Sequence, residues 1–431
     1  MYDRDRRWNL VVGEVAVPIQ LVSLGGIFLL VLLGWLLSTS RRDVNWKTVG
    51  VGLALQFSLA LFILKFPPGQ WLFQKAGAGV TGLLDFAKQG AGFVFGKLMD
   101  VSSFGFVFAF QVLPTIIFMA SVISVLYYLG IVQRVVAALA WVMRKLMGTS
   151  GPESLSAAAC VFVGQVEGPL LVRPYIATMS RSELMALMTG GMATIAGGVM
   201  AAYIGLLGGQ WAPALLAASL MGAPGGLAMS KLLVPETRGT AAEGSADTND
   251  AMMNVEIHES SVIEAAAKGA SDGMHLAFTV AAMLLAFVSL VAMLNGGLGI
   301  LGSWLGIAGL SLEKILGIAF FPLAVMLGVP LADAGAVANM IGTKLVLNEF
   351  LSYAALSDMI LTRTISERGA LIATFALCGF ANLSSIAQNV GGIGSMAPER
   401  RGELARLGPR AMIAGAMASC MSAAMAGLLL T

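Results

Sequence analysis

Long apolar runs separated by short polar connections dominate the chain. Runs of about 20 largely apolar residues, the length that a helix needs to cross a bilayer, occur eight times, at roughly 17–38, 47–65, 103–129, 183–208, 211–231, 273–295, 369–391 and 408–430. No charged residue lies between Glu183 and Lys231. The pattern predicts an all-α integral membrane protein with eight transmembrane helices, in which residues 1–431 form a single membrane unit.

Two further apolar stretches are interrupted by polar groups near their middle. They are roughly 152–179, which contains Glu167, and 318–357, which contains Lys344 and Glu349. A lipid-facing helix excludes such groups, and irregular backbone at membrane depth is tolerated only where protein or a water-filled cavity surrounds it. We therefore expect both stretches to form re-entrant hairpins.

The order of these elements repeats along the chain. A hairpin followed by two spans occurs at 152–231 and again at 318–430, and the span at 273–295 separates the two copies. A hairpin leaves the chain on the side where it entered, so one intervening span makes the second copy enter from the opposite side. This predicts an inverted-topology repeat with a substrate site between the copies, as in many secondary transporters. The two copies share little sequence identity, so a chance order of elements is the alternative.

The composition supports a bilayer as the solvent. Apolar residues make up 57% of the chain and charged residues 12%, against about 45–50% and about 25% in soluble domains, and the mean hydropathy is +0.84. These values exclude a soluble enzyme, a nucleic-acid binder and a disordered chain. The net charge is +2, and the three cysteines show no metal-binding spacing. We expect a multi-pass protein of the cell (inner) membrane.

Basic residues in short connections predict the orientation of the spans. Four groups fall on one side of the predicted topology: Arg41, Arg42 and Lys47; Arg134, Arg144 and Lys145; Arg173 and Arg181; and Arg400, Arg401, Arg406 and Arg410. That side is expected to be cytoplasmic, with both termini outside, although Arg4, Arg6, Arg7, Arg363 and Arg368 oppose this assignment. The connection at 234–272 holds eight acidic and two basic residues and is expected to be a flexible cytoplasmic loop.

Two glutamates carry the most informative charges. Glu167 and Glu349 each lie within a hairpin, and Gln165 and Asn348 stand close to them in the sequence. A charge at the bilayer centre costs about 2.5–3.5 kcal/mol, so each glutamate must face an interior site or a partner. A structural ion pair between Glu349 and Lys344 is the alternative. Carboxylates with amides suit a polyhydroxylated, uncharged substrate.

Two other stretches suggest backbone ligands. Residues 379–385, GFANLSS, interrupt the seventh span with groups that form competing hydrogen bonds to the backbone. In the fourth span, Thr194 lies between Gly190-Gly191 and Gly197-Gly198, where carbonyls and a hydroxyl suit a hard monovalent cation. Close helix packing through small residues is the alternative for both stretches. Considered alone, it explains residues 379–385 equally well and is the favoured explanation for the glycines around Thr194.

Several motifs resemble the concentrative nucleoside transporter family, in the form of its bacterial members. They are GQVEGPL at 164–170, RPY at 173–175, GMATIAGG at 191–198, NEF at 348–350 and CGFANLSSI at 378–386. The resemblance extends from about residue 20 to the C-terminus. It implies eight spans with two opposed hairpins, a homotrimer, and a transport unit that moves as an elevator against a scaffold formed by the spans at 103–129 and 273–295.

The resemblance also implies the binding residues. The nucleobase would be bound by Gln165 and Glu167, the ribose hydroxyls by Glu349, Asn382 and Ser385, and the apolar faces of the nucleoside by Phe380 and Val199. The coupling ion, sodium, would be held by the carbonyls of Cys160, Val163 and Ile195 and by Thr194. Val166 belongs to the substrate set, but many members have a hydroxyl residue there, and Gly168 replaces another small residue. The preference between purines and pyrimidines is therefore left open.

The expected function is sodium-coupled uptake of nucleosides, uridine among them, by a protein that is not an enzyme and has no nucleic-acid partner. Three alternatives stay open: proton coupling with Glu167 or Glu349 as the carrier, a facilitator or channel for small polar solutes, and an intramembrane enzyme that uses the two carboxylates. The hydroxyl of Thr194 favours sodium.

Overall fold

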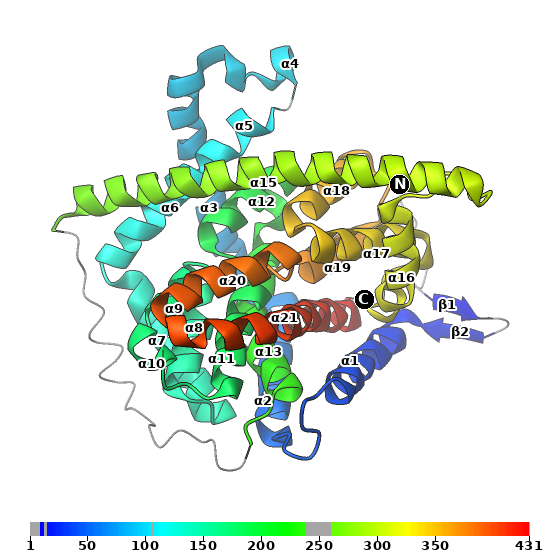
Figure 1. Ribbon diagram of the computed structural model, residues 1–431. Helices are drawn as coiled ribbons and strands as arrows, with labels where there is room; N and C mark the ends of the chain where they lie inside the picture. Colours follow the sequence, from blue (N-terminus) through cyan, green and yellow to red (C-terminus); the bar gives the residue numbers. More distant parts are fainter. Residues whose placement is uncertain (1–8, 13–14, 106, 238–259, 431) are drawn as a thin grey trace.

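The structure is a computed structural model that describes residues 9–12, 15–105, 107–237 and 260–430. Apart from the short paired strands β1 (Asn9–Val12) and β2 (Val15–Pro18), the regular elements in these ranges are helices, which pack into one bundle (Figure 1). Seven segments of the described chain are long and apolar enough to cross a membrane: Ile19–Leu36, Trp46–Leu64, Phe108–Tyr128, Arg181–Leu207, Gly209–Leu233, Val262–Trp304 and Pro398–Leu429. The predicted span at 369–391 is divided into two shorter helices.

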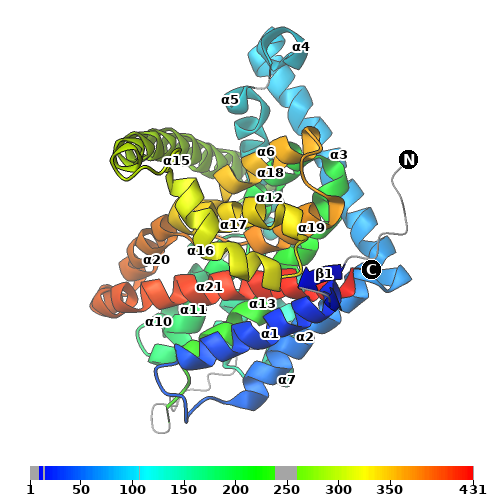
Figure 2. The same cartoon turned by 90° about the vertical axis from the view of Figure 1, so that its right-hand side faces the viewer.

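Burial separates an inner group of helices from an outer one. In the segment Arg181–Leu207, 94% of the most apolar window is buried, whereas the figure for Val262–Trp304 is 11%. The latter segment is α15 (Val262–Trp304), a 43-residue helix that lies along one side of the molecule in both views (Figure 1, Figure 2). Large apolar side chains such as Phe278 and Leu285 on α15 are exposed. A broad apolar face without a protein cover is what a helix in contact with lipid presents.

The first two predicted spans are α1 (Ile19–Leu36) and α2 (Trp46–Leu64). The next helix, α3 (Pro67–Phe95), was not predicted, because Lys75, Asp85 and Lys88 interrupt its apolar pattern. It begins with proline, whose missing N–H costs nothing at the first helical position. Then follow η1 (Gly96–Met99), α4 (Val101–Phe104), α5 (Phe108–Gln111), α6 (Leu113–Tyr128) and the unpredicted α7 (Ile131–Met147). The third predicted span, at 103–129, corresponds to α5 and α6.

The first predicted hairpin consists of α8 (Gly151–Cys160), α9 (Glu167–Leu170) and α10 (Arg173–Ile176). The chain doubles back between α8 and α9, so that α9 lies directly against α8. The contact is close enough that a methyl group on Gly168 would lie 3.2 Å from the carbonyl oxygen of Ser156. The fourth predicted span, at 183–208, corresponds to the apolar segment Arg181–Leu207, but its break was not predicted. It is divided into α11 (Arg181–Ala193) and α12 (Gly197–Leu207), which are followed by η2 (Gly209–Trp211) and α13 (Ala212–Leu233).

The second repeat contains the same kinds of elements. Its hairpin is α17 (Leu331–Val346) and α18 (Glu349–Leu361), which Ser352 Oγ joins to the carbonyl of Met340 (2.8 Å). The predicted start at 318 was wrong, because residues 312–326 form a separate helix, α16 (Leu312–Met326). The seventh span is α19 (Glu367–Leu377) and α20 (Leu383–Met396), so the predicted interruption near 379–385 is confirmed. The chain ends with η3 (Pro398–Arg400) and α21 (Arg401–Leu429).

The acidic connection predicted at 234–272 is shorter than expected. The helix α15 begins at Val262, with Ser261 as its N-cap accepting from the amide of Glu264 (3.1 Å). A serine cap with a glutamate three residues later is a common start signal for a helix. Residues 238–259 of this connection lie outside the described ranges.

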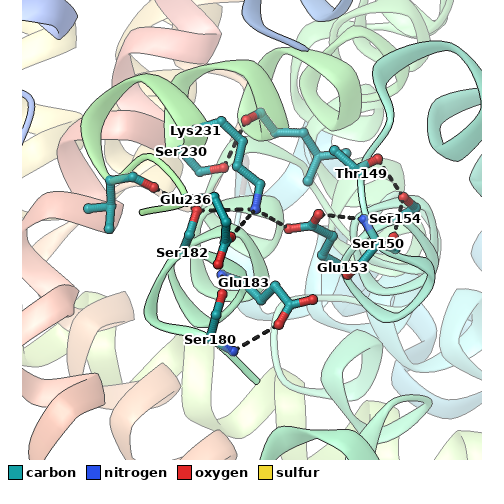
Figure 3. Close-up of polar contacts among 12 residues, drawn as sticks. Thr149, Ser150, Glu153, Ser154, Ser180, Ser182, Glu183, Ser230, Lys231 and Glu236 are labelled. Carbon is teal, nitrogen blue, oxygen red and sulfur yellow. Dashed lines mark hydrogen bonds and ion pairs between the residues drawn. The ribbon is translucent and has the colours of Figure 1, made fainter. Parts of the chain in front are cut away.

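A buried ion pair fixes the first hairpin to the helices that follow it (Figure 3). Lys231 Nζ, near the end of α13, lies 2.7 Å from Glu153 Oε2 on α8 and donates to Ser182 Oγ on α11 (3.1 Å). Glu153 Oε1 also accepts from the amide of Ser150 (2.7 Å) and completes a capping box at the start of α8. These extra bonds offset the cost of removing both charges from water.

Arg368 has a comparable position in the second repeat. It lies in the first turn of α19, and its guanidinium donates to the carbonyls of Gly328 (3.0 Å), Gly427 (2.6 Å) and Leu430 (3.0 Å). A basic side chain thus joins a broken helix to the end of the long helix in each repeat. The inner ends of the hairpins and of the broken helices carry the candidate site.

Candidate functional site

The candidate residues gather where four helices begin. Glu167 is the first residue of α9, Gly197 of α12, Glu349 of α18 and Leu383 of α20. Two of these helices are capped by an asparagine. Asn348 Oδ1 accepts from the amide of Leu351 (3.0 Å), and Asn382 Oδ1 accepts from the amide of Ser385 (2.8 Å). Asparagine is a preferred N-cap, so the sequence itself directs the helices to start at the site.

Glu349 lies at the centre of a buried polar cluster. Its side chain is 5% exposed. Oε2 accepts from Asn382 Nδ2 (2.9 Å), and Oε1 accepts from the hydroxyl of Tyr203 (2.8 Å). A buried carboxylate requires such donors. The cluster joins the second hairpin, the break between α19 and α20, and α12, which are far apart in the sequence.

A second cluster joins the first hairpin to α20. Gln165 Nε2 donates to Ser385 Oγ (3.2 Å) and to Gln388 Oε1 (2.5 Å), and Gln165 Oε1 accepts from Asn389 Nδ2 (3.0 Å). Asn382 caps the helix that carries Ser385, so the two clusters are adjacent. The structure therefore brings together four residues of the predicted substrate set, one from the first repeat and three from the second: Gln165, Glu349, Asn382 and Ser385.

The other four predicted substrate residues are placed less centrally. Glu167 is exposed, and within the described chain no side chain donates to its carboxylate. Val166 packs on α20, since a methyl group on Gly392 would lie 2.6 Å from its Cγ1. Val199 is buried in α12, and Phe380 lies half-buried in the break between α19 and α20. None of these side chains makes a hydrogen bond to the two polar clusters.

Lys344 does not form the ion pair with Glu349 that the sequence left open. Its Nζ donates instead to the carbonyls of Ala376 (3.0 Å) and Cys378 (3.2 Å) and to Ser419 Oγ (3.2 Å). Among the described residues, the ion pairs within 4.0 Å do not include Lys344. The carboxylate of Glu349 therefore keeps Tyr203 and Asn382 as its donors, and both are groups that a hydroxylated ligand can replace.

The predicted sodium ligands lie at the tip of the first hairpin and in the break between α11 and α12. Cys160 ends α8, and Thr194 and Ile195 belong to the break. The two segments are joined by a hydrogen bond from the amide of Gly197 to the carbonyl of Phe162 (3.0 Å). Thr194 Oγ1 donates to the carbonyl of Gly190 (2.9 Å), so its lone pairs stay available to a cation.

These residues fit a cation bound by backbone and hydroxyl oxygens. The described chain contains no group of three or more histidine, cysteine, aspartate or glutamate side chains that could hold a metal ion. Unwound carbonyls and the C-terminal ends of half-helices are, however, typical sodium ligands in transporters. The thiol of Cys160 is not one of these ligands, because it faces Gly168, and only its carbonyl belongs to the predicted set.

Three residues of the clusters were not predicted: Tyr203, Gln388 and Asn389. The sequence does contain a signal for them. Ser385, Gln388 and Asn389 follow Asn382 at helical spacing, and Tyr203 follows Val199 by one helical turn. Residues three and four apart lie on the same helical face, so the predicted members of the site indicate its further members.

The two breaks touch each other. Gly379 has a φ of +112°, which favours glycine, and a methyl group there would lie 2.6 Å from the carbonyl oxygen of Met192. The segment that carries Phe380 and Asn382 therefore lies directly against the end of α11. Residues proposed for the substrate and for sodium are thus adjacent.

Comparisons with known proteins agree with this arrangement. Three family models match the chain: "Na+ dependent nucleoside transporter N-terminus" at residues 25–98, "Nucleoside recognition" at 109–210, and "Na+ dependent nucleoside transporter C-terminus" at 214–427. Together they cover most of the chain, including both hairpins and both breaks.

Relatives with similar sequences come from bacteria and mammals. A transporter of Haemophilus influenzae is 46% identical over 413 residues, which cover 95% of this chain and 97% of the relative. Sodium/nucleoside cotransporter 1 of Sus scrofa is 40% identical over 433 residues, which cover 97% of this chain and 65% of that protein. The human cotransporter of the same name is 40% identical over 425 residues, with coverages of 96% and 64%.

Solved structures share the fold. The structure of CNTnw in an inward-facing, substrate-bound state has a TM-score of 0.89 and 42% sequence identity, and the match covers 95% of this chain and 98% of that one. A CNTnw variant in an outward-facing state gives the same TM-score, identity and coverage. The fold is therefore common to both states.

Proposed function

The chain belongs to the sodium-dependent nucleoside transporter family, and on this basis we propose that it moves nucleosides into the cell together with sodium. The family comprises membrane transporters, so the chain is a nucleoside transporter of the cell membrane and not an enzyme. The observation that carries the finer proposal is the contact between the two breaks, because it joins the candidate nucleoside residues to the candidate sodium residues.

The ribose hydroxyls are assigned to Glu349, Asn382 and Ser385. These side chains already form hydrogen bonds with one another or with neighbours, so each can exchange a protein partner for a substrate hydroxyl. None of the three is a cation, which fits an uncharged substrate. A ligand that lacks a hydroxyl would leave a buried polar group without a partner, at a cost of about 1–3 kcal/mol.

The nucleobase is assigned to Gln165 and Glu167, with Phe380 and Val199 against the apolar faces and Val166 at the edge. The amide of Gln165 offers both a donor and an acceptor, and the exposed carboxylate of Glu167 offers acceptors. The small residue at 168 has a packing role, because a methyl group on Gly168 would overlap the Cys160 thiol. We propose uridine and other nucleosides as substrates.

Sodium is assigned to the carbonyls of Cys160, Val163 and Ile195 and to Thr194. Val163 precedes Gln165 by two residues in the same hairpin tip. An ion that holds this tip in place orders the amide for the nucleobase. By linkage, sodium then raises nucleoside affinity by the same factor by which the nucleoside raises sodium affinity.

We further propose a homotrimer in which a transport unit moves as an elevator against a scaffold of α6 and α15. These two helices are joined by hydrogen bonds from Ser121 Oγ to the carbonyl of Ala266 (2.8 Å) and from Ser124 Oγ to that of Ala265 (2.7 Å). By contrast, α12 meets α6 through Gly197 and Gly198, and the hydrogen bonds of the described residues do not cross that contact. Small, apolar surfaces favour sliding, whereas the polar contacts favour a fixed pair.

The test is uptake of radiolabelled uridine by proteoliposomes that contain the purified protein. With an inward sodium gradient, uridine is expected to accumulate above equilibrium, and the uptake is expected to collapse when choline replaces sodium. Uptake that ignores sodium and follows a pH step would instead establish proton coupling, for which Glu167 or Glu349 is the candidate carrier. Equilibration without accumulation would establish a facilitator, and chemically altered uridine inside the vesicles would establish an enzyme.

A further inference from the structure

The two breaks are built alike, with a serine from the following long helix against each one. Ser219 on α13 accepts from the amide of Ile195 and donates to its carbonyl, both at 3.1 Å. Ser419 on α21 donates to the carbonyl of Cys378. Each break begins where a helix ends, and the last carbonyls of a helix lack intrahelical donors and carry partial negative charge. Both breaks therefore present oxygens that favour a cation.

The second break already contains a cation. Lys344 Nζ is bonded to the carbonyls of Ala376 and Cys378 and to Ser419 Oγ, at 3.0–3.2 Å. These three bonds use the three donors of the ammonium group. The side chain is 1% exposed, and no carboxylate of the described residues lies within ion-pair distance of it. The charge is thus held by carbonyl and hydroxyl oxygens alone.

The first break has the same kind of oxygens without a charged side chain. Among the described residues, the donors there are Thr194 Oγ1, which bonds to the carbonyl of Gly190, and Ser219 Oγ. No lysine or arginine of these residues donates to the carbonyls that end α11. This is the break to which we assign sodium.

Lys344 and Phe162 have the same sequence offset from the hairpin glutamate of their repeat. Lys344 precedes Glu349 by five residues, and Phe162 precedes Glu167 by the same number. The carbonyls of Cys160 and Val163 flank Phe162, whose own carbonyl accepts from the amide of Gly197 (3.0 Å). In both repeats, the residue five positions before the hairpin glutamate therefore joins the hairpin to the break. Phe162 does so through its backbone carbonyl in the first repeat, and Lys344 does so through its ammonium group in the second.

We propose that Lys344 is a tethered cation that permanently occupies, in the second repeat, the place that a transported sodium ion takes in the first. It holds the second hairpin against the break that carries Asn382, so it is a positioning residue for the ribose side of the site. One break then needs an ion from solution and the other does not, which sets one sodium ion per nucleoside. This inference rests on the proposed sodium coupling.

The test compares two substitutions by sodium titration. Lys344→Ser removes the charge and leaves space with a hydroxyl, whereas Lys344→Met removes the charge and keeps most of the volume. Initial rates of uridine uptake are measured in proteoliposomes against sodium concentration, with choline as the replacement. The thermal unfolding midpoint of the purified protein is measured against sodium without nucleoside.

For the unmodified protein we expect a Hill coefficient for sodium near one. Lys344→Ser should lower uptake at least tenfold at low sodium, recover part of it at high sodium, and raise the Hill coefficient toward two in both measurements. Lys344→Met should lose uptake without recovery, because its side chain fills the space. The matched control is the double variant Glu153→Gln, Lys231→Met, which removes the other buried lysine together with its partner and should keep the coefficient near one.

Several outcomes would overturn the proposal. One is a folded Lys344→Ser protein whose Hill coefficient for sodium stays near one. Another is a folded Lys344→Ser protein whose lost uptake is not recovered at high sodium. If neither variant folds, the proposal is tested by the charge that the unmodified protein moves with each uridine. The proposal requires one elementary charge per uridine, and two charges per uridine would contradict it. If the unmodified protein shows no sodium dependence at all, the sodium coupling fails before Lys344 is tested, so the two failures are distinguishable.

Discussion

Asn382 performs two separable tasks, and one substitution separates them. Its Nδ2 donates to Glu349 Oε2 (2.9 Å), and its Oδ1 caps α20 through the amide of Ser385 (2.8 Å). Serine is also a good N-cap but is too short to replace the amide group. Asn382→Ser therefore removes the contact with the carboxylate and keeps the start of the helix, whereas Asn382→Ala removes both.

The expected loss of affinity follows from the ribose hydroxyl that is left without its amide partner. A buried polar group without a partner costs about 1–3 kcal/mol, and each 1.4 kcal/mol is about a tenfold change in the dissociation constant. Asn382→Ser should therefore weaken uridine binding about 5- to 150-fold. The lost cap in Asn382→Ala should cost about 1 kcal/mol more in the free energy of unfolding.

The assay is calorimetric binding of uridine to the purified protein in sodium buffer, with thermal unfolding measured on the same samples. Asn45→Ala serves as the control, because Asn45 caps α2 by accepting from the amides of Lys47 and Thr48, far from the site. It should lower stability and leave affinity unchanged. Uridine binding of normal strength by a folded Asn382→Ser protein would refute the ribose assignment.

Three further substitutions probe neighbouring features. Tyr203→Phe removes the hydroxyl that donates to the carboxylate of Glu349 and should lower uridine uptake about tenfold. Its control, Tyr353→Phe, removes an equally buried hydroxyl that donates to a backbone carbonyl and should change uptake less than about threefold. Equal effects of the two substitutions would contradict the role of Tyr203. Thr194→Val should raise the sodium concentration for half-maximal uptake at least tenfold. Its control, Thr189→Val, removes a buried hydroxyl without a partner and should leave this concentration unchanged. The same increase in both variants would remove Thr194 from the sodium set. Gly379→Ala introduces a side chain at a φ of +112° against a backbone carbonyl and should lower the thermal unfolding midpoint by several degrees; an unchanged midpoint would mean that the breaks separate readily.

The sequence predicted the interrupted seventh span but not the interrupted fourth one, and the difference has a physical cause. In residues 379–385, Asn382 accepts from Ser384 Oγ and from the amide of Ser385 and so caps the start of α20, which gives this break a local signal. At Thr194–Ala196 the compensating group is Ser219, which lies on another helix. A break that is satisfied by a distant residue leaves no local signal in the sequence.

The candidate site shows the same division between local and distant information. Glu167 and Glu349 were identifiable because an isolated charge in an apolar run must have a reason to be there. Tyr203 was not, because tyrosine is common in membrane helices and its role depends on a carboxylate 146 residues later in the chain. The partner of Lys344 was also beyond the sequence, since backbone carbonyls carry no residue-specific signal.

The length of α15 constrains how it lies in the bilayer. At 1.5 Å per residue, its 43 residues extend for about 65 Å, more than twice the hydrocarbon thickness of about 30 Å. Even at a tilt of 40°, the upper end of the usual range, its axis still projects about 50 Å along the membrane normal. The helix can therefore rock through tens of degrees without withdrawing either end into the hydrocarbon. Its surplus length lets this helix remain membrane-spanning in a bilayer that thins or thickens locally.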